Sequence, residues 1–235
     1  MRDNDSIRRS RRNFLGALAS GAATLGLTSV APLSVHAKTL SDTFSDPLND
    51  DDPEAFVKGL NGKHKMVFDV TEPHEMLPFV WPRVFLMTNE MSGSPAKENN
   101  AVVILLHGAI PYAMEDRLWE KYKFGDVFKV TDSGTQQVAM HNAFWKPKVG
   151  DFKVPGVGNV AIGINELQAS GVRFAVCNMA LTVYSAVVAD KMNMQPEAVK
   201  KDWMAGILPG IHVVPSGVWA VGRAQEHGCA YCFVG

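Results

Sequence analysis

The chain has 235 residues, of which 46% are hydrophobic, 9% aromatic and 20% charged. This composition excludes an intrinsically disordered chain, a collagen and a disulfide-dense miniprotein. The 23 basic and 24 acidic side chains nearly cancel, giving a formal net charge of −1. The overall positive charge of many nucleic-acid-binding proteins is therefore missing, and we expect no nucleic-acid partner.

The charge is unevenly distributed along the chain. Residues 1–37 contain five Arg and two Asp, a net charge of +3, whereas the other 198 residues contain 18 basic and 22 acidic side chains, a net charge of −4. The uncharged stretch Phe14–Val30 follows the charged start, and Val35 and Ala37 lie at positions −3 and −1 of a cleavage site. This order predicts a signal peptide that is cleaved near Ala37. A retained membrane anchor is the alternative, although Phe14–Val30 is only weakly apolar for a bilayer of about 30 Å.

The segment Ser10–Leu15 (SRRNFL) resembles the twin-arginine (Tat) signal of bacterial export. The weak hydrophobicity of Phe14–Val30 fits this route better than general secretion. The resemblance implies a protein that folds before the Tat export machinery carries it across the membrane. We therefore expect a soluble, periplasmic mature protein.

The remaining sequence predicts one domain over residues 63–235, preceded by a polar segment over residues 38–62 with one short helix from Pro53. Short β-rich runs alternate with segments of helical length. The predicted strands are His64–Thr71, Ala101–His107, Val172–Cys177, Ile211–Pro215 and Cys229–Val234. The predicted helices are the part of Leu77–Met91 after Trp81, Met114–Tyr122, Thr135–Trp145, Asn159–Ala169, Ala180–Met192, Pro196–Ala205 and Val218–His227. This alternation predicts a three-layer α/β/α sandwich with a five-stranded, mainly parallel sheet.

In sheets of this kind, ligands bind where the carboxyl ends of strands lead into helices. Cys177 ends a predicted strand immediately before a predicted helix. Unpaired backbone N–H groups and the positive end of the helix dipole favour the thiolate, which is the nucleophilic form of cysteine. The alternative is a buried structural cysteine, since cysteine is among the most buried residue types.

His107 ends the most aliphatic predicted strand, and Gly108 after it allows close approach of other groups to the backbone. If the two strands are neighbours, His107 lies near Cys177 as a base, an acid or an electrostatic partner. A half-buried histidine with a purely structural hydrogen bond is the alternative.

The motif Cys229-Ala230-Tyr231-Cys232 supplies the other two cysteines. A C-x-x-C motif is typical of a redox pair, half of a zinc site or a haem attachment. Phe233 replaces the histidine of a haem attachment, and a zinc site needs two further ligands. The motif also falls in a predicted strand, where residues i and i+3 point to opposite faces, so a local disulfide requires a turn or bulge. Either Cys229 pairs with Cys232 and Cys177 is free, which is the arrangement we favour, or one of the two pairs elsewhere.

The segment Gly156–Ala161 matches a loose G-x-G-x-x-A dinucleotide fingerprint. No aliphatic strand precedes it, and the next strand ends in Cys177 and Asn178 rather than in the acidic residue that binds a ribose. We expect neither a nucleotide cofactor nor a resident metal.

Three segments together resemble the DsrE/DsrF-like family of small sulfur-handling proteins over about residues 65–234. They are AVVILLHGAI, INELQASGVRFAVCNMAL and LPGIHVVPSGVWAVGRAQEHGCAYCFV. The resemblance implies a parallel five-stranded sheet, a persulfide-carrying cysteine at Cys177, and a homo-oligomer (trimer or hexamer) with this cysteine near a subunit interface. It also implies sulfur donor and acceptor thiols as partners, with Asn178 contributing a backbone N–H.

The alternatives are a non-catalytic oligomeric binding protein and a thiol-redox or metal-handling protein that uses Cys229 and Cys232. Whether the chain is a sulfurtransferase-like enzyme stays open in the sequence.

Overall fold

The computed structural model describes residues 52–132 and 134–235, which belong to one compact unit, Pro47–Gly235. The predicted signal peptide (residues 1–37) and most of the predicted polar segment (residues 38–62) lie outside the described residues.

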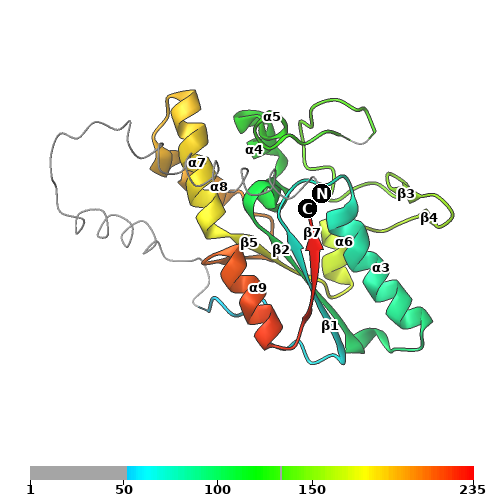
Figure 1. The fold of residues 1–235 in the computed structure, drawn as a ribbon. Coiled ribbons are helices and arrows are strands. Elements are labelled where there is room, and N and C mark those ends of the chain that lie inside the picture. Colours follow the sequence, from blue (N-terminus) through cyan, green and yellow to red (C-terminus); the bar gives the residue numbers. More distant parts are fainter. Residues whose placement is uncertain (1–51, 133) are drawn as a thin grey trace, which may run out of the picture. The chain divides into compact units, whose positions relative to one another are not determined.

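Five parallel strands form the central sheet in the order β6-β5-β2-β1-β7 (Figure 1). The strands are β1 His64–Val70, β2 Asn99–Leu105, β5 Arg173–Cys177, β6 Ile211–Val214 and β7 Ala230–Val234. A separate two-stranded hairpin joins β3 Lys153–Val154 to β4 Gly158–Asn159. The predicted α/β class and its five-stranded sheet are confirmed, and all of the sheet's strands are parallel.

Helices cover both faces of the sheet. The helices are α3 Leu77–Met91, η1 Ala96–Glu98, η2 His107–Ala113, α4 Asp116–Tyr122, α5 Phe124–Phe128, α6 Ile164–Ala169, α7 Asn178–Met192, α8 Pro196–Ala205 and α9 Gly217–Glu226. On one face α9 packs against β1, β2 and β5, while α3 and α6 cover the other face (Figure 1). Within residues 52–132 and 134–235, no helix combines the length and the hydrophobicity that crossing a lipid bilayer requires.

The centre of the core is β2, whose residues from Ala101 to Leu105 are fully buried. A strand with helices on both faces needs apolar side chains on both faces, which explains the unbroken aliphatic run in the sequence. The helix α9 approaches this strand so closely that a Cβ at Gly217 would collide with the side chain of Leu106.

Two segments that contain proline depart from the predicted helices. Helix α3 begins at Leu77, not after Trp81. Pro78 lies in its first turn, where no helical partner exists for a backbone N–H, so proline is tolerated there. Pro82 removes one hydrogen bond inside the helix, and burial of its ring accompanies this loss. The chain after Pro53 forms successive turns, not the predicted short helix.

The helix predicted over Thr135–Trp145 is absent, because side chains satisfy its backbone groups instead. The carboxylate of Asp132 accepts hydrogen bonds from the backbone N–H groups of Gly134 and Thr135. The Asp116 carboxylate accepts from the Asn142 N–H, and Asn142 Oδ1 accepts from the Phe144 N–H. The Asn142 amide group also donates to the carbonyls of Tyr112 and Met114, which lie outside the segment. Such side-chain-to-backbone bonds compete with helix formation.

The helix predicted over Asn159–Ala169 starts only at Ile164. Gly158 and Asn159 instead form the second strand of the hairpin, and the backbone at Gly156 and Gly158 has positive φ angles of 78° and 95°. The loose dinucleotide fingerprint therefore lies in the turn and second strand of a short β-hairpin, and it does not connect a strand of the main sheet to a helix.

Helices α7 and α8 pack against each other, and α8 is tied to α4 through Asp202. The Asp202 carboxylate accepts hydrogen bonds from Arg117, Lys121 and Tyr122 of α4, at 2.5, 2.7 and 2.7 Å. Burial raises the pKa of Asp202, but these three hydrogen bonds outweigh it and lower the pKa to about 2. This link fixes the position of α7 and α8, the two helices that follow Cys177.

A matched pair of glycine substitutions in α9 tests the packing of this helix on β2. We expect Gly217→Ala to lower the free energy of unfolding by about 1–3 kcal/mol, because the new methyl group overpacks Leu106. Gly222→Ala meets no neighbouring atom within 4 Å, and we expect it to raise the free energy of unfolding by about 0.5–1 kcal/mol. Urea unfolding followed by circular dichroism measures both, and equal effects of the two variants would contradict the packing.

The Asp202 cluster predicts a pH-dependent contribution to stability. Because the pKa of Asp202 is about 2 in the folded protein and about 3.9 in an unfolded chain, its contribution is complete above the unfolded value. It is lost as the pH falls toward the folded value. We expect Asp202→Asn to destabilise the protein at pH 7 and to have progressively less effect between about pH 4 and pH 2. Urea unfolding across this range measures the difference, with the exposed Asp190→Asn as control.

Candidate functional site

The carboxyl ends of four neighbouring strands lie side by side along one border of the sheet. We call this border the edge of the sheet, as distinct from the outermost strands β6 and β7. Val70 pairs with Leu105, Leu105 with Val176, and Cys177 with Val214, so β1, β2, β5 and β6 end at similar heights. The strands that precede His107 and Cys177, β2 and β5, are neighbours, a point that the sequence left open. Any group that follows one of these strands lies along this edge.

Cys177 is both the last residue of β5 and the N-cap of the 15-residue helix α7. Its Sγ accepts a hydrogen bond from the backbone N–H of Ala180 at 3.3 Å. The sulfur therefore occupies the position where a helix supplies unpaired donors and the positive end of its dipole. Cys177 is also only 5% exposed, so the surrounding residues limit the size of the molecules that reach it.

Asn178, the first residue of α7, is buried, and its Oδ1 has no hydrogen-bond donor within the described structure. A buried amide oxygen without a donor costs free energy. The side chain of Asn178 thus offers an unused acceptor in the residue next to Cys177. The sequence drew attention only to the backbone N–H of this residue.

His107 begins η2 and has a positive φ of 49°. A residue in this left-handed conformation cannot continue a strand, so β2 ends at Leu105 rather than at His107 as predicted. The turn aims the imidazole ring at two partners, since Nδ1 lies 2.7 Å from the Glu72 carboxylate and Nε2 lies 3.2 Å from the Tyr184 hydroxyl.

Gly108 makes room for this arrangement. A Cβ at this position would collide with Oε2 of Glu72, and the Gly108 N–H donates to the carbonyl of Thr71 at 2.8 Å. The expectation that Gly108 allows a close approach is confirmed, and the approaching group is a carboxylate.

Glu72, His107 and Tyr184 form a chain of hydrogen bonds at the edge of the sheet, which we call the Glu72–His107–Tyr184 chain. Burial, and after it the negative charge of Glu72, raises the pKa of Tyr184. We infer that its hydroxyl stays protonated and donates to Nε2, which leaves Nδ1–H to donate to the carboxylate. The chain can hold and pass on a proton.

The hydrogen bonds of His107 do not reach Cys177. The two ring nitrogens of His107 are hydrogen-bonded to Glu72 and Tyr184, and the Cys177 sulfur accepts its hydrogen bond from the Ala180 N–H. The His107 side chain is 61% exposed, in contrast to the buried thiol. The link between them is α7, which carries Cys177 at its start and Tyr184 two turns later.

Cys229 and Cys232 do not form a disulfide, and all three cysteines are free in the structure. Cys229 is buried at the end of α9, where its N–H donates to Ala224, and Cys232 is half-buried in β7. Burial raises the pKa of both thiols. Both are therefore mainly protonated at neutral pH and weakly nucleophilic.

A small hollow lies apart from these residues. It is lined by Glu75, Tyr112, Trp119, Val130, Thr131, Asp132, Ala139, His141, Ala143 and Phe144. In the described part of the chain, no three His, Cys, Asp or Glu side chains are close enough together to hold a metal ion.

The fold and this edge define an α/β protein with a thiol at a helix N-terminus. No family model and no curated protein matches the chain. It is similar to the structure of MTH1491, a protein of unknown function from Methanobacterium thermoautotrophicum. The two are 18% identical over 73% of this chain and 99% of that chain, with a TM-score of 0.36. A likeness of this size does not identify a family.

The Glu72–His107–Tyr184 chain predicts which ring nitrogen of His107 is protonated. We expect neutral His107 to be the Nδ1–H tautomer, because Nδ1 faces a carboxylate and Nε2 faces a hydroxyl donor. Long-range ¹H–¹⁵N NMR correlations measure this, with the exposed His74 as internal reference. Glu72→Gln is expected to weaken the preference, and an Nε2–H tautomer in the unmodified protein would contradict the assignment.

Proposed function

We propose that the protein is a persulfide carrier of the sulfurtransferase type, related to DsrE/DsrF-like proteins, in which Cys177 holds the transferred sulfur. The position of Sγ at the N-terminus of α7, with the Ala180 N–H as donor, is the observation that carries the proposal. At this position unpaired backbone N–H groups of the first helical turn face the sulfur. Neither Cys229 nor Cys232 has a comparable surrounding, since burial raises the pKa of both.

In the proposed reaction one S–S bond forms for each S–S bond that breaks, so no external oxidant is needed. The Cys177 thiolate attacks the outer sulfur of a donor persulfide, R–S–SH, and an Sγ–S bond forms as the S–S bond of the donor breaks. The donor leaves as a thiolate with the electron pair of the broken bond. An acceptor thiolate then attacks the outer sulfur on Cys177, which restores the Cys177 thiolate.

The Glu72–His107–Tyr184 chain serves this reaction as a positioning and proton-holding group. His107 lies at the same sheet edge as Cys177, and its orientation is fixed from both sides. The unpaired Oδ1 of Asn178 is an acceptor for the S–H proton of the loaded sulfur.

The burial of Cys177 restricts the donors. A hydrogen polysulfide or another small persulfide fits a site with 5% exposure better than a protein donor, which requires the covering residues to move. We further propose export through the Tat machinery, a periplasmic location and assembly into trimers or hexamers. The sequence features of residues 1–37 and the family resemblance support these three statements.

The same burial favours a second candidate, a non-catalytic oligomeric binding protein with a structural Cys177. The two candidates differ in the reactivity of the folded protein. The carrier reacts with iodoacetamide and with polysulfide at Cys177 under native conditions, whereas a structural cysteine reacts only after unfolding. A redox pair of Cys229 and Cys232 would instead require a disulfide between them.

The persulfide proposal predicts a mass change at one residue. Treatment of the C229S/C232S variant with polysulfide is expected to add about 32 Da, the mass of one sulfur, to the peptide that contains Cys177. Mass spectrometry of the intact and digested protein measures this addition, and dithiothreitol should remove it.

The matched control adds Cys177→Ser to the same background, and its labelling is expected to fall to the background level. Serine retains an oxygen that can cap α7, so the control variant should fold. Equal labelling with and without Cys177, or no labelling of the folded protein, would refute the proposal.

A further inference from the structure

The strand β7 is the outermost strand on one side of the sheet, and its outer side forms an open edge. It pairs with β1 on one side, and no described residue pairs with its other side (Figure 1). The Val234 carbonyl accepts from the Thr71 N–H, so the backbone groups of Val234 and Cys232 point toward β1. The N–H and C=O groups of the alternate residues Tyr231 and Phe233 therefore point outward, where a further strand can pair with them.

Nothing in the sequence of β7 protects this edge. The strand Ala230–Val234 (AYCFV) contains no charged residue and no proline, which are common features that prevent edge pairing. The opposite edge strand, β6, has only four residues and lies between Pro209 and Pro215. The two edges thus differ, and only β7 has the composition of a strand that pairs.

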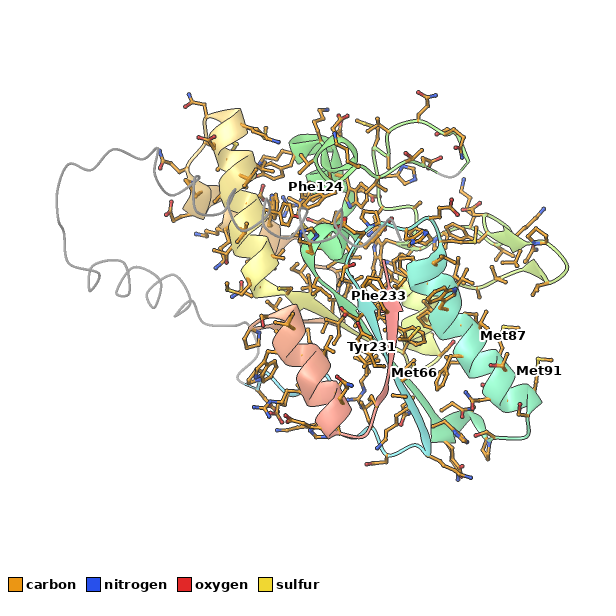
Figure 2. All side chains as sticks on the ribbon, in the orientation of Figure 1. Met66, Met87, Met91, Phe124, Tyr231 and Phe233 are labelled. Atoms are coloured by element: carbon orange, nitrogen blue, oxygen red, sulfur yellow. The ribbon has the colours of Figure 1, made fainter. Side chains whose placement is uncertain are left out.

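The aromatic side chains of β7 are exposed on the face that α9 covers elsewhere. Tyr231 pairs with Val67 and Phe233 with Asp69, and these two aromatic residues are 46% and 50% exposed. Helix α9 packs on β1, β2 and β5 and leaves β7 uncovered. Figure 2 shows Tyr231 and Phe233 along the strand between α9 and α3.

The other side of this edge is also apolar. Phe85 of α3 packs on Phe68 of β1, and Trp81 lies one helical turn before Phe85 on the same side of the helix. Val84, Met87 and Met91 are also exposed, the last of them 82%, but at 100° per residue they point away from the sheet. Met87 and Met91 are labelled on α3 in Figure 2.

We propose that a second copy of this chain docks on this edge, with its β7 antiparallel to the first β7 and a two-fold axis through Cys232. Tyr231 then lies opposite Phe233 of the second copy, and each pair exchanges two backbone hydrogen bonds. The axis stands perpendicular to the sheet, so the faces that α3 covers lie on the same side in the two copies. On the other face, Tyr231 and Phe233 meet their counterparts. The contact is self-complementary, as a two-fold interface requires.

The charge of the strand suits a second copy. In the antiparallel register no charged side chain of one β7 lies opposite one of the other, and the carboxylate of Asp69 on β1 accepts a hydrogen bond from the Tyr231 hydroxyl. At roughly 100 Å² for each half-exposed large side chain, Trp81, Tyr231 and Phe233 offer on the order of 300 Å². A standard interface buries about 800 Å² per partner, so the backbone hydrogen bonds between the paired strands carry much of this contact.

This contact goes beyond the proposed sulfur chemistry and does not depend on it. Cys177 ends β5, and β5 is separated from β7 by β2 and β1. Loss of the dimer and loss of persulfide formation are therefore distinguishable outcomes.

The antiparallel arrangement places the two copies of Cys232 at a non-hydrogen-bonded position, with Cα atoms about 4.5 Å apart, within the range of a disulfide. The test uses the full chain with Cys177→Ser and Cys229→Ser, so that Cys232 is the sole thiol. Diamide is expected to convert most of the folded protein into a disulfide-linked dimer, while diamide itself is reduced to its hydrazine. Cys232→Ser in the same background should abolish the product.

A second variant tests the interface without oxidation. Replacement of Tyr231 and Phe233 by Lys is expected to weaken self-association at least tenfold, measured by native mass spectrometry and light scattering. Val218→Lys, on a residue of α9 that is 73% exposed, should leave self-association unchanged. The proposal is overturned if the full chain is a monomer at 100 μM, or if the Lys variant associates as tightly as the original chain. It is also overturned if hydrogen exchange shows that residues 1–51 protect the amides of Tyr231 and Phe233 in a monomer.

Discussion

The parallel direction of all five strands is the constraint on which the other features depend. Parallel strands cannot be joined by short turns, so each connection must run back along a face of the sheet. These connections supply α3, α6 and α9, which bury β2 on both faces. The same direction brings the carboxyl ends of β1, β2 and β5 to one edge. Glu72, His107 and Cys177 share this edge although more than a hundred residues separate the first from the last.

Much of the architecture could be predicted from the sequence, because the local signals agree with the tertiary fold. The aliphatic run after Ala101 identified the central strand to within two residues, and Pro196 marked the first residue of α8. The sequence also correctly predicted that Cys177 lies between the end of a strand and the start of a helix. In each case, the pattern that the isolated segment favours is the one that the buried environment requires.

The parts that could not be predicted depend on contacts between distant residues. The local sequence around Asn142 does not show that its side chain bonds to carbonyls some 30 residues earlier. Glu72 and Tyr184 lie 35 and 77 residues from His107, so nothing local connects them to it. The left-handed backbone at His107 is likewise enforced by its surroundings, since a histidine rarely adopts it alone. The site could be located by topology, but its hydrogen bonds needed the structure.

The cap of α7 has a consequence for how this sequence can vary. Sulfur is a weak hydrogen-bond acceptor, and serine or aspartate at the same position would cap the helix better. If folding alone were selected, substitution of Cys177 by a stronger cap would be favoured over time. A cysteine that persists there among homologous chains would therefore indicate that stability has been sacrificed for reactivity, whereas frequent exchange with serine would indicate a residue kept only for its shape.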